Sequence, residues 1–393
     1  MNVLMLLEND YEKDLRVKRE VRALHEAGFR VTVAAISRER DFPPEQRDNC
    51  LLYKRKIPVF IYKSSVAALK LPFYFNFWRK YVREIVRDYP ADIIHVNDLP
   101  LARIGLEMKK AGNVKFVLDL HENWPGLLRN AQHTRTLAGR LASSDKQWVR
   151  YEKDMVQEAD MVITVVEEAG DRVAALTDRP EKIYIVSNTI DTENISFYER
   201  QGKNREFTLF YGGAINKHRG LQIVIQAIKI LKDRNVPVSL QIIGTGSYRK
   251  VLEKEIEKND LSSRIEFHGY KPLTAMLEML SHADAAIIPH LRNENNDASM
   301  PNKLFQYMFS ATPVISSDCI SLKRIILETG AGFIYRNDSP SELASLLEQL
   351  SHNRDMTGER GKKGREAVLA RYNWNHDRKQ LIDAYKNLSK TDT

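Results

Sequence analysis

Short apolar runs alternate with helix-like segments along this chain of 393 residues, and the alternation occurs twice. Strands that alternate with helices predict a mostly parallel, doubly wound sheet. The first series has apolar runs at 3–7, 30–36, 91–96, 114–118 and 161–166. The second series has apolar runs at 207–211, 239–243, 264–268, 285–289 and 313–316. The sequence therefore predicts an α/β protein with two Rossmann-like domains.

A polar stretch at 192–205 separates the two series and is the expected linker. We expect a first domain at 1–195, a second domain at 206–370 and a closing segment at 371–393. Ligands of parallel sheets bind beyond the carboxyl ends of the strands. Two facing sheets therefore place the expected ligand site in a cleft between the domains.

Composition narrows the possible functions. No apolar stretch approaches the roughly 20 residues of a membrane span, and the opening apolar run is expected to be a strand rather than a signal peptide. Two cysteines, Cys50 and Cys319, argue against a disulfide framework and predict a cytoplasmic protein. The net charge of +8 favours anionic partners. No known nucleic-acid motif and no zinc-type cluster occurs, so neither nucleic acid nor a metal is predicted.

Two segments of the second half suit an anion. Pro301 is expected to open a helix with Lys303 in its first turn, where free N–H groups favour phosphate. The loop at 212–220 begins with glycines and carries Arg219, which could pair with a diphosphate through two hydrogen bonds. The alternatives are a solvated lysine on a surface helix and an ordinary exposed basic loop.

Polar side chains also follow two strands of the first half. His121 lies between Asp119 and Glu122, directly after the run at 114–118, and Asp98 follows the run at 91–96. A histidine between two acids could transfer protons or donate a hydrogen bond to a sugar. The alternative is a structural histidine.

Taken in order, these segments resemble retaining glycosyltransferase family 4 over nearly the whole chain. The segment PNKLFQYMFSATPVISSD is similar to the family's PxKLFEYMAxGxPVIxSD, and GGAINKHRG resembles its G-x-x-x-x-x-K/R-G segment. LQIIGTGSY is similar to its strand and Gly-x-Gly turn, and IVSNTID to its N-x-x-D segment. DLHENWP and DLRV resemble the D-x-H-E and D-x-R-V segments of one subgroup. YNWNHDRKQLIDAY is similar to the closing helix.

The resemblance implies a GT-B fold, with two Rossmann-like domains facing across a cleft and the closing helix crossing back to the first domain. It implies a nucleotide-diphosphate sugar held mainly by the second domain and a glycan or lipid-linked acceptor. It also implies retention of anomeric configuration. No metal and no cofactor is expected, because basic side chains and helix N-termini neutralise the leaving diphosphate.

The resemblance also suggests roles for single residues. Arg219 and Lys303 are assigned to the diphosphate and His121 to the transferred sugar, which makes these three the catalytic candidates. The donor-binding candidates are Gly213, Gly244, Gly246, Tyr270, Pro301, Asn302 and Gln306. The acceptor-side candidates are Asp14, Arg16, Asp98 and Glu122.

The sequence departs from the family at its Glu–x7–Glu pair. Gln306 replaces the second glutamate, and Ala298 stands at the position of the first. A glutamine can still accept ribose hydrogen bonds through its carbonyl oxygen. Candidates for the place of the first glutamate are Glu294, Asn296 and Asp297. These departures keep two alternatives open: a non-catalytic binding or partner subunit, and a sugar-nucleotide epimerase on the same fold.

Residues 49–83 contain eight Lys or Arg and no Asp or Glu. The helix expected at 73–87 would carry Tyr74, Trp78 and Tyr81 on one face. This face could dock on an anionic membrane and present a lipid-linked acceptor. Alternatively, it packs on its own sheet while long basic stems cover apolar surface. Further candidates for an acceptor surface are Arg129, Arg135, Arg140, Lys146 and Arg150.

Overall fold

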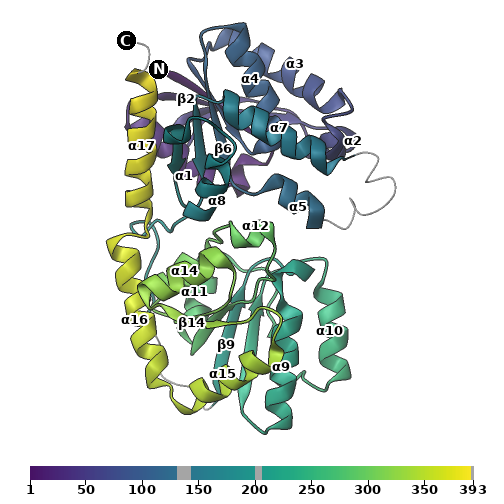
Figure 1. Ribbon diagram of the computed structural model, residues 1–393, viewed down its shortest axis with the longest axis vertical. Helices are drawn as coiled ribbons and strands as arrows, with labels where there is room; N and C mark the ends of the chain where they lie inside the picture. Colours follow the sequence, from purple (N-terminus) through teal and green to yellow (C-terminus); the bar gives the residue numbers. More distant parts are fainter. Residues whose placement is uncertain (131–142, 200–205, 391–393) are drawn as a thin grey trace. The chain divides into compact units, whose positions relative to one another are not determined.

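The structure is a computed structural model that describes residues 1–130, 143–199 and 206–390 (Figure 1). The chain folds as two compact units, Met1–Ser187 with the segment from Asp377 onward, and Asn188–His376. Part of the expected linker lies outside the described residues. Arg135 and Arg140, two candidates for an acceptor surface, also lie outside them. No helix in the described residues combines the length and the apolar character that a bilayer crossing requires. The cleft expected between the units stays a prediction.

In the described residues, the first unit contains an eight-stranded sheet of order β3-β4-β2-β1-β5-β6-β7-β8. Its strands are β1 (Asn2–Leu7), β2 (Arg30–Ser37), β3 (Phe42–Arg47), β4 (Cys50–Lys56), β5 (Ile93–Asn97), β6 (Lys115–Leu120), β7 (Met161–Thr164) and β8 (Ile183–Ile185). All pairs are parallel except β3 with β4. The strand order changes direction between β1 and β5, and the carboxyl ends of these strands form the switch point where ligands of such sheets bind.

Helices cover both faces of this sheet (Figure 1). They are α1 (Leu15–Glu26), α2 (Val59–Lys63), α3 (Phe73–Asp88), α4 (Ala102–Ala111), α5 (Trp124–Asn130), α7 (Asp145–Glu158), α8 (Glu167–Ala174) and the 3-10 turns η1 (Tyr11–Lys13), η2 (Ser64–Ala67), η3 (Leu99–Leu101) and η5 (Pro180–Lys182). The aromatic face of α3 belongs to the core, because Tyr74, Trp78 and Tyr81 are at most 1% exposed. The hypothesis that this face docks on a membrane is therefore wrong, and the alternative packing on the sheet is what the structure shows.

In the described residues, the second unit contains a six-stranded parallel sheet of order β11-β10-β9-β12-β13-β14. Its strands are β9 (Phe207–Gly212), β10 (Val238–Ile243), β11 (Ile265–Phe267), β12 (Ala285–Ile288), β13 (Val314–Ser317) and β14 (Gly332–Tyr335). Its helices are η6 (Lys217–Arg219), α9 (Leu221–Asp233), α10 (Arg249–Lys258), α11 (Leu273–Ser281), α12 (Glu294–Asp297), α13 (Lys303–Phe309), α14 (Ile320–Thr329), α15 (Pro340–His352) and α16 (Asp355–Ala370). The switch point here lies between β9 and β12, which pair directly.

The last helix, α17 (Trp374–Lys390), begins in the second unit and continues in the first (Figure 1). The ring of Tyr385 packs edge-on against Phe29, with ring centroids 5.4 Å apart. Arg378 pairs with Glu26 of α1 at 2.5 Å. The resemblance predicted that the closing helix crosses back to the first domain, and the structure agrees.

Candidate functional site

Positively charged and imidazole side chains gather at the switch point of the second unit. Arg219 lies on η6 in the loop after β9, and His290 is the second residue after β12. The two loops are joined, because the Leu291 N–H donates to the His218 carbonyl at 3.0 Å. Arg219 Nη1 donates to His290 Nε2 at 3.0 Å. Lys303, the first residue of α13, places its Nζ 4.1 Å from the centroid of the Tyr211 ring.

Three N–H donors of this cluster are buried without a partner in the described residues: Arg219 Nε, His290 Nδ1 and Lys303 Nζ. Burial and the Arg219 charge hold the pKa of Lys303 well below its usual range, and the same causes lower the pKa of His290. They also lower the pKa of His218 to about 4. The cluster thus carries positive potential and unsatisfied donors, a combination that suits a bound anion.

The glycines proposed to approach a nucleotide have another role in the structure. Gly213 and Gly244 have φ of 143° and 137°. A Cβ at Gly244 would overlap the Gly213 carbonyl oxygen, and one at Gly246 would overlap the Ile215 carbonyl oxygen. The loops after β9 and β10 therefore pack backbone against backbone. A Cβ at Gly213 would collide with the Lys303 ammonium, so the absence of a side chain there makes room for Lys303.

Three of the remaining donor candidates, Pro301, Asn302 and Gln306, lie at or in α13, and Tyr270 lies between β11 and α11. Helix α13 begins at Lys303 rather than at Pro301, and the side chain of Asn302 at its N-cap makes no capping bond. Gln306 is partly exposed, whereas Tyr270 is 78% exposed.

Two of the three candidates for the place of the missing first glutamate are held by neighbouring residues. Asp297 pairs with Arg292 at 3.1 Å. The Asn296 amide donates to the Leu291 carbonyl at 2.7 Å. Glu294 is exposed at the start of α12, and Ala298 ends that helix.

A buried charge cluster lies at the carboxyl edge of the first sheet. Both oxygens of Asp119 accept from Arg16 Nη2, at 3.1 and 3.0 Å, and His121 Nε2 is 3.1 Å from Asp119 Oδ2. The D-x-R-V and D-x-H-E segments are therefore held together by an ion pair. Arg16 is only 5% exposed, and Asp14 accepts the Val17 N–H as the N-cap of α1. Both residues position neighbouring groups in the structure, and their expected place on the acceptor side stays a prediction.

His121 also contacts Asp98. Its backbone N–H donates to Asp98 Oδ1 at 3.1 Å, and its Nδ1 is 3.7 Å from Asp98 Oδ2. Burial opposes protonation of His121, but the charges of Asp119 and Asp98 outweigh burial and raise its pKa to about 10. His121 Nε2 lies 3.1 Å from both Asp119 Oδ2 and the Arg16 Nε–H donor. The raised pKa favours the protonated ring, in which His121 can donate a hydrogen bond. Glu122, the next residue, is exposed.

The sequence did not indicate Glu8, which directly follows β1 at the switch point. Burial and the nearby charge of Asp98 raise the pKa of Glu8 to about 8. Its position after a strand was a usable signal, because the same criterion identified Asp98 and His121.

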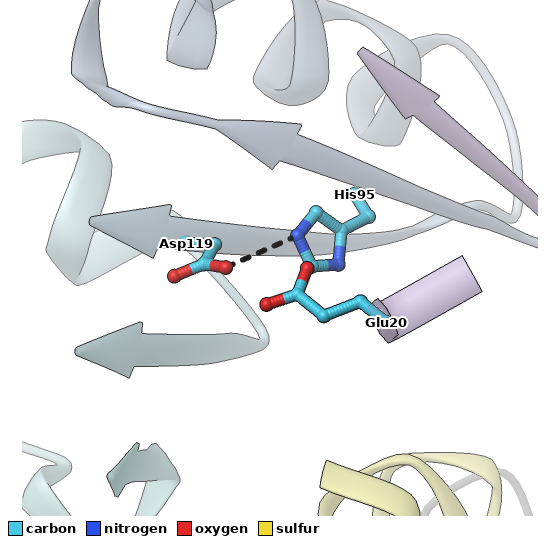
Figure 2. Close-up of side chains that lie close together, drawn as sticks. All are labelled: Glu20, His95 and Asp119. Atoms are coloured by element: carbon cyan, nitrogen blue, oxygen red, sulfur yellow. Dashed lines mark ion pairs between the residues drawn. The ribbon is translucent and has the colours of Figure 1, made fainter. Parts of the chain in front are cut away.

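Glu20, His95 and Asp119 have potential ligand atoms within 4.8 Å of one another (Figure 2). They are the one such group in the described residues. Arg16 lies against both carboxylates, with Nε 3.0 Å from Glu20 Oε1 and Nη2 3.0 Å from Asp119 Oδ2. A divalent cation would have to sit beside this guanidinium, so the residues present fit a metal poorly.

Comparison with known proteins decides the family. Residues 16–194 match the family model "Glycosyltransferase Family 4", and residues 191–367 match the model "Glycosyl transferases group 1". The chain belongs to glycosyltransferase family 4.

This glycosyltransferase is similar to the putative colanic acid biosynthesis glycosyltransferase WcaL of Salmonella typhimurium, with 22% identity over 238 residues. That match covers 60% of this chain and 59% of WcaL. Among solved structures it resembles the sucrose-phosphate synthase of Thermosynechococcus elongatus, with 16% identity, a TM-score of 0.80 and 99% of each chain covered. It also resembles HepE of Anabaena in complex with UDP-glucose, with 13% identity, a TM-score of 0.71 and 98% and 99% covered. These structures confirm the GT-B fold.

Proposed function

We propose that the chain moves a sugar from a nucleotide-diphosphate sugar to a glycan or lipid-linked acceptor with retention of anomeric configuration. The observation that carries this proposal is the set of buried, unpartnered N–H donors of Arg219, His290 and Lys303. They extend from both sides of the switch point of the second unit, where parallel sheets bind their ligands. A diphosphate offers oxygen acceptors to all three.

The same donors can assist the reaction. When the bond between the sugar and the phosphate breaks, negative charge develops on the leaving diphosphate. Donors that are already fixed stabilise this charge without reorganising. Arg219 can form two parallel hydrogen bonds, and Lys303 supplies a point charge. In this account no metal and no cofactor is required.

The relatives support a choice of substrates to test first. HepE was solved with UDP-glucose, and WcaL is named for colanic acid biosynthesis. We therefore take UDP-sugars as the first donors to test. Surface polysaccharide or glycoconjugate assembly on the cytoplasmic side of the membrane is the proposed process.

In the first unit we assign His121 to a hydroxyl group of the bound sugar. Its raised pKa favours the protonated ring, which is a charged hydrogen-bond donor. Asp98 and Glu8, at the switch point of the first sheet, are the candidates for contact with the acceptor. Glu8, with a pKa of about 8, is a neutral carboxylic acid near pH 7 that can both donate and accept.

Product analysis tests the proposal. The protein is incubated with a panel of nucleotide sugars and acceptor glycans, and products are identified by mass spectrometry. A new glycoside with release of nucleoside diphosphate, absent in Arg219→Ala, is the expected result. Nucleotide binding without any product would favour the alternative of a non-catalytic binding subunit. Gln306 and Ala298, which replace the two glutamates of the family, support that alternative. A changed free sugar would favour the epimerase.

Membrane contact is proposed at a different place from the aromatic face of α3. Val59, Phe60, Leu71 and Phe73 are 64%, 61%, 43% and 47% exposed. The rings of Phe60 and Phe73 pack edge-on with centroids 5.7 Å apart, so they form one apolar patch on α2 and the start of α3. Exposed basic residues nearby in the sequence are Lys56, Lys63 and Lys70. Exposed aromatic and basic side chains together suit an anionic lipid surface.

Liposome flotation tests this contact. We expect the protein to float with anionic vesicles, and the double variant Phe60→Ser, Phe73→Ser to lose most of this binding. Tyr270→Ser, which removes an aromatic ring exposed on the second unit, is the matched control and should float normally. Equal flotation of the wild-type protein with neutral and anionic vesicles would contradict the proposal.

A further inference from the structure

His290 is a fully buried imidazole that no sequence motif indicated. It is 0% exposed and lies two residues after β12, on the side of the switch point opposite the loop that carries Arg219. A histidine in such a place either packs in the core or contacts the ligand. Its hydrogen bonds distinguish these two roles.

The guanidinium of Arg219 can only donate, so His290 Nε2 must accept the hydrogen bond that joins them at 3.0 Å. A neutral imidazole that accepts at Nε2 carries its proton at Nδ1. Groups that face it in the described residues are Arg219, Lys303 and His218, all basic, and they disfavour a second proton. His290 is therefore a neutral ring whose tautomer is set by Arg219.

The Nδ1–H of His290 has no acceptor in the described residues although it is buried. Leaving a buried N–H group without a partner costs about 1–3 kcal/mol. Two other unpartnered donors, Arg219 Nε and Lys303 Nζ, belong to the same cluster. In a core histidine this N–H would donate to an acceptor such as a backbone carbonyl. A nearby buried hydroxyl has such an acceptor, because Ser317 Oγ donates to the backbone carbonyl of His290 at 2.6 Å.

We propose that His290 is a binding residue for the donor, with its Nδ1–H donating to a diphosphate oxygen while its Nε2 holds the Arg219 guanidinium in place. This inference rests on the proposed function, because it presumes a nucleoside diphosphate at the switch point of the second unit. Phosphate recognition then combines one neutral donor with two basic side chains. The neutral donor adds a hydrogen bond without adding repulsion to the crowded positive charges.

Calorimetric titration of the whole protein with UDP and with inorganic pyrophosphate tests the inference. Pyrophosphate carries no base, so it reports on the diphosphate contacts for any donor nucleotide. His290→Phe keeps the size of the ring and removes both nitrogens, and His290→Gln keeps one acceptor and one donor. Tyr335→Phe is the control, since Tyr335 is buried in the same unit and its hydroxyl has no partner in the described residues.

The expected result has three parts. His290→Phe weakens binding of the ligand at least tenfold, His290→Gln recovers part of the loss, and the melting temperature without ligand does not fall. Binding by His290→Phe within twofold of the wild-type protein would overturn the inference. So would an equal loss of melting temperature and affinity in both variants, because His290 would then be structural. If the wild-type protein binds neither UDP nor pyrophosphate, the proposed function itself fails.

Discussion

Lys303 combines two properties that rarely occur together in a stable protein interior. Its ammonium nitrogen is buried over the Tyr211 ring without a hydrogen-bond partner in the described residues, and it lies in a cluster with Arg219, a like charge. Both burial and repulsion oppose its protonation. A residue kept in such surroundings indicates that the site is built for a ligand rather than for stability.

Lys303→Met tests this interpretation at the level of one side chain. Methionine keeps a long flexible stem and removes the charge. We expect the free energy of unfolding without ligand to rise by about 1–3 kcal/mol, because a buried unpaired group is lost. We expect affinity for UDP to fall at least tenfold. Chemical denaturation and calorimetry measure the two quantities, and lower stability with unchanged affinity would contradict the account.

Glu8 provides a pH-dependent prediction. Its pKa is about 8 in the folded protein against an ordinary value of 4.5, so the folded state holds this proton more tightly than the unfolded state. The free energy of unfolding therefore loses this contribution as the pH rises from about 4.5 to about 8. Relative to the wild-type protein, the free energy of unfolding of Glu8→Gln should rise by roughly 3–4 kcal/mol between pH 5 and pH 8.5.

Urea denaturation at several pH values measures this difference. The surface variant Glu257→Gln, at an exposed position on α10, is the control and should follow the wild-type protein at every pH. A constant difference between Glu8→Gln and the wild-type protein across this range would show that Glu8 titrates normally.

The sequence identified charged residues that follow strands, and it could do so because strand ends are visible in the apolar pattern. Arg219 and His121 became candidates in this way, whereas Lys303 became one through its place in the first turn of an expected helix. It missed His290, because the bond to Arg219 joins positions 71 residues apart and depends on β9 lying beside β12. It also did not show that the Arg16 side chain is buried against Asp119, because a motif carries no information on burial.

At the scale of elements, α17 is tied to the first sheet by a buried hydrogen bond. Tyr385 Oη is 2.6 Å from Nδ1 of His95 on β5, and neither residue is exposed. Burial holds the pKa of Tyr385 well above its usual range, so its hydroxyl keeps its proton and donates. The other ring nitrogen of His95 faces Asp119 Oδ2 at 3.6 Å. The closing helix thus contacts the charge cluster that holds His121.

Tyr385→Phe should lower the free energy of unfolding by about 1–2 kcal/mol, because the acceptor on His95 is left buried without a donor. Tyr335→Phe removes a buried hydroxyl that has no partner in the described residues, so it should change stability by less than about 0.5 kcal/mol. Denaturant unfolding of both variants measures the difference. Equal effects would show that the bond to His95 does not contribute.

Elements with a clear apolar pattern were predicted well, and those without one were missed. The edge strand β3 has the sequence FPPEQR, with two prolines and mostly exposed residues, so no alternation marks it as a strand. Prolines are tolerated there because an edge strand needs only part of its hydrogen bonds. β4 ends in three basic residues and was included in the basic stretch instead. The aromatic residues of α3 suggested a membrane surface, although burial in the core explains them.

At the scale of the whole molecule, two separate sheets each place their charged residues at a switch point. The first unit gathers Glu8, Asp98 and His121 there, and the second gathers Arg219, His290 and Lys303. The fold is shared with solved structures at 13–16% identity, so the apolar pattern and the glycine turns specify it more than particular side chains do. The sequence could predict this fold because the alternation of strands and helices is long and regular. The identity of the sugar donor and of the sugar acceptor depends on a few side-chain contacts, which the apolar pattern does not show.

We propose that the second unit binds a nucleoside diphosphate through the cluster of Arg219, His290 and Lys303. The most direct test is a thermal-shift measurement of the wild-type protein and Arg219→Ala with UDP, GDP, ADP, TDP and CMP. A ligand at about 100 times its dissociation constant adds about 2.7 kcal/mol of stability. We expect a clear rise in melting temperature with one nucleoside diphosphate, which Arg219→Ala largely loses. No shift with any nucleotide, or an equal shift in Arg219→Ala, would contradict the proposal.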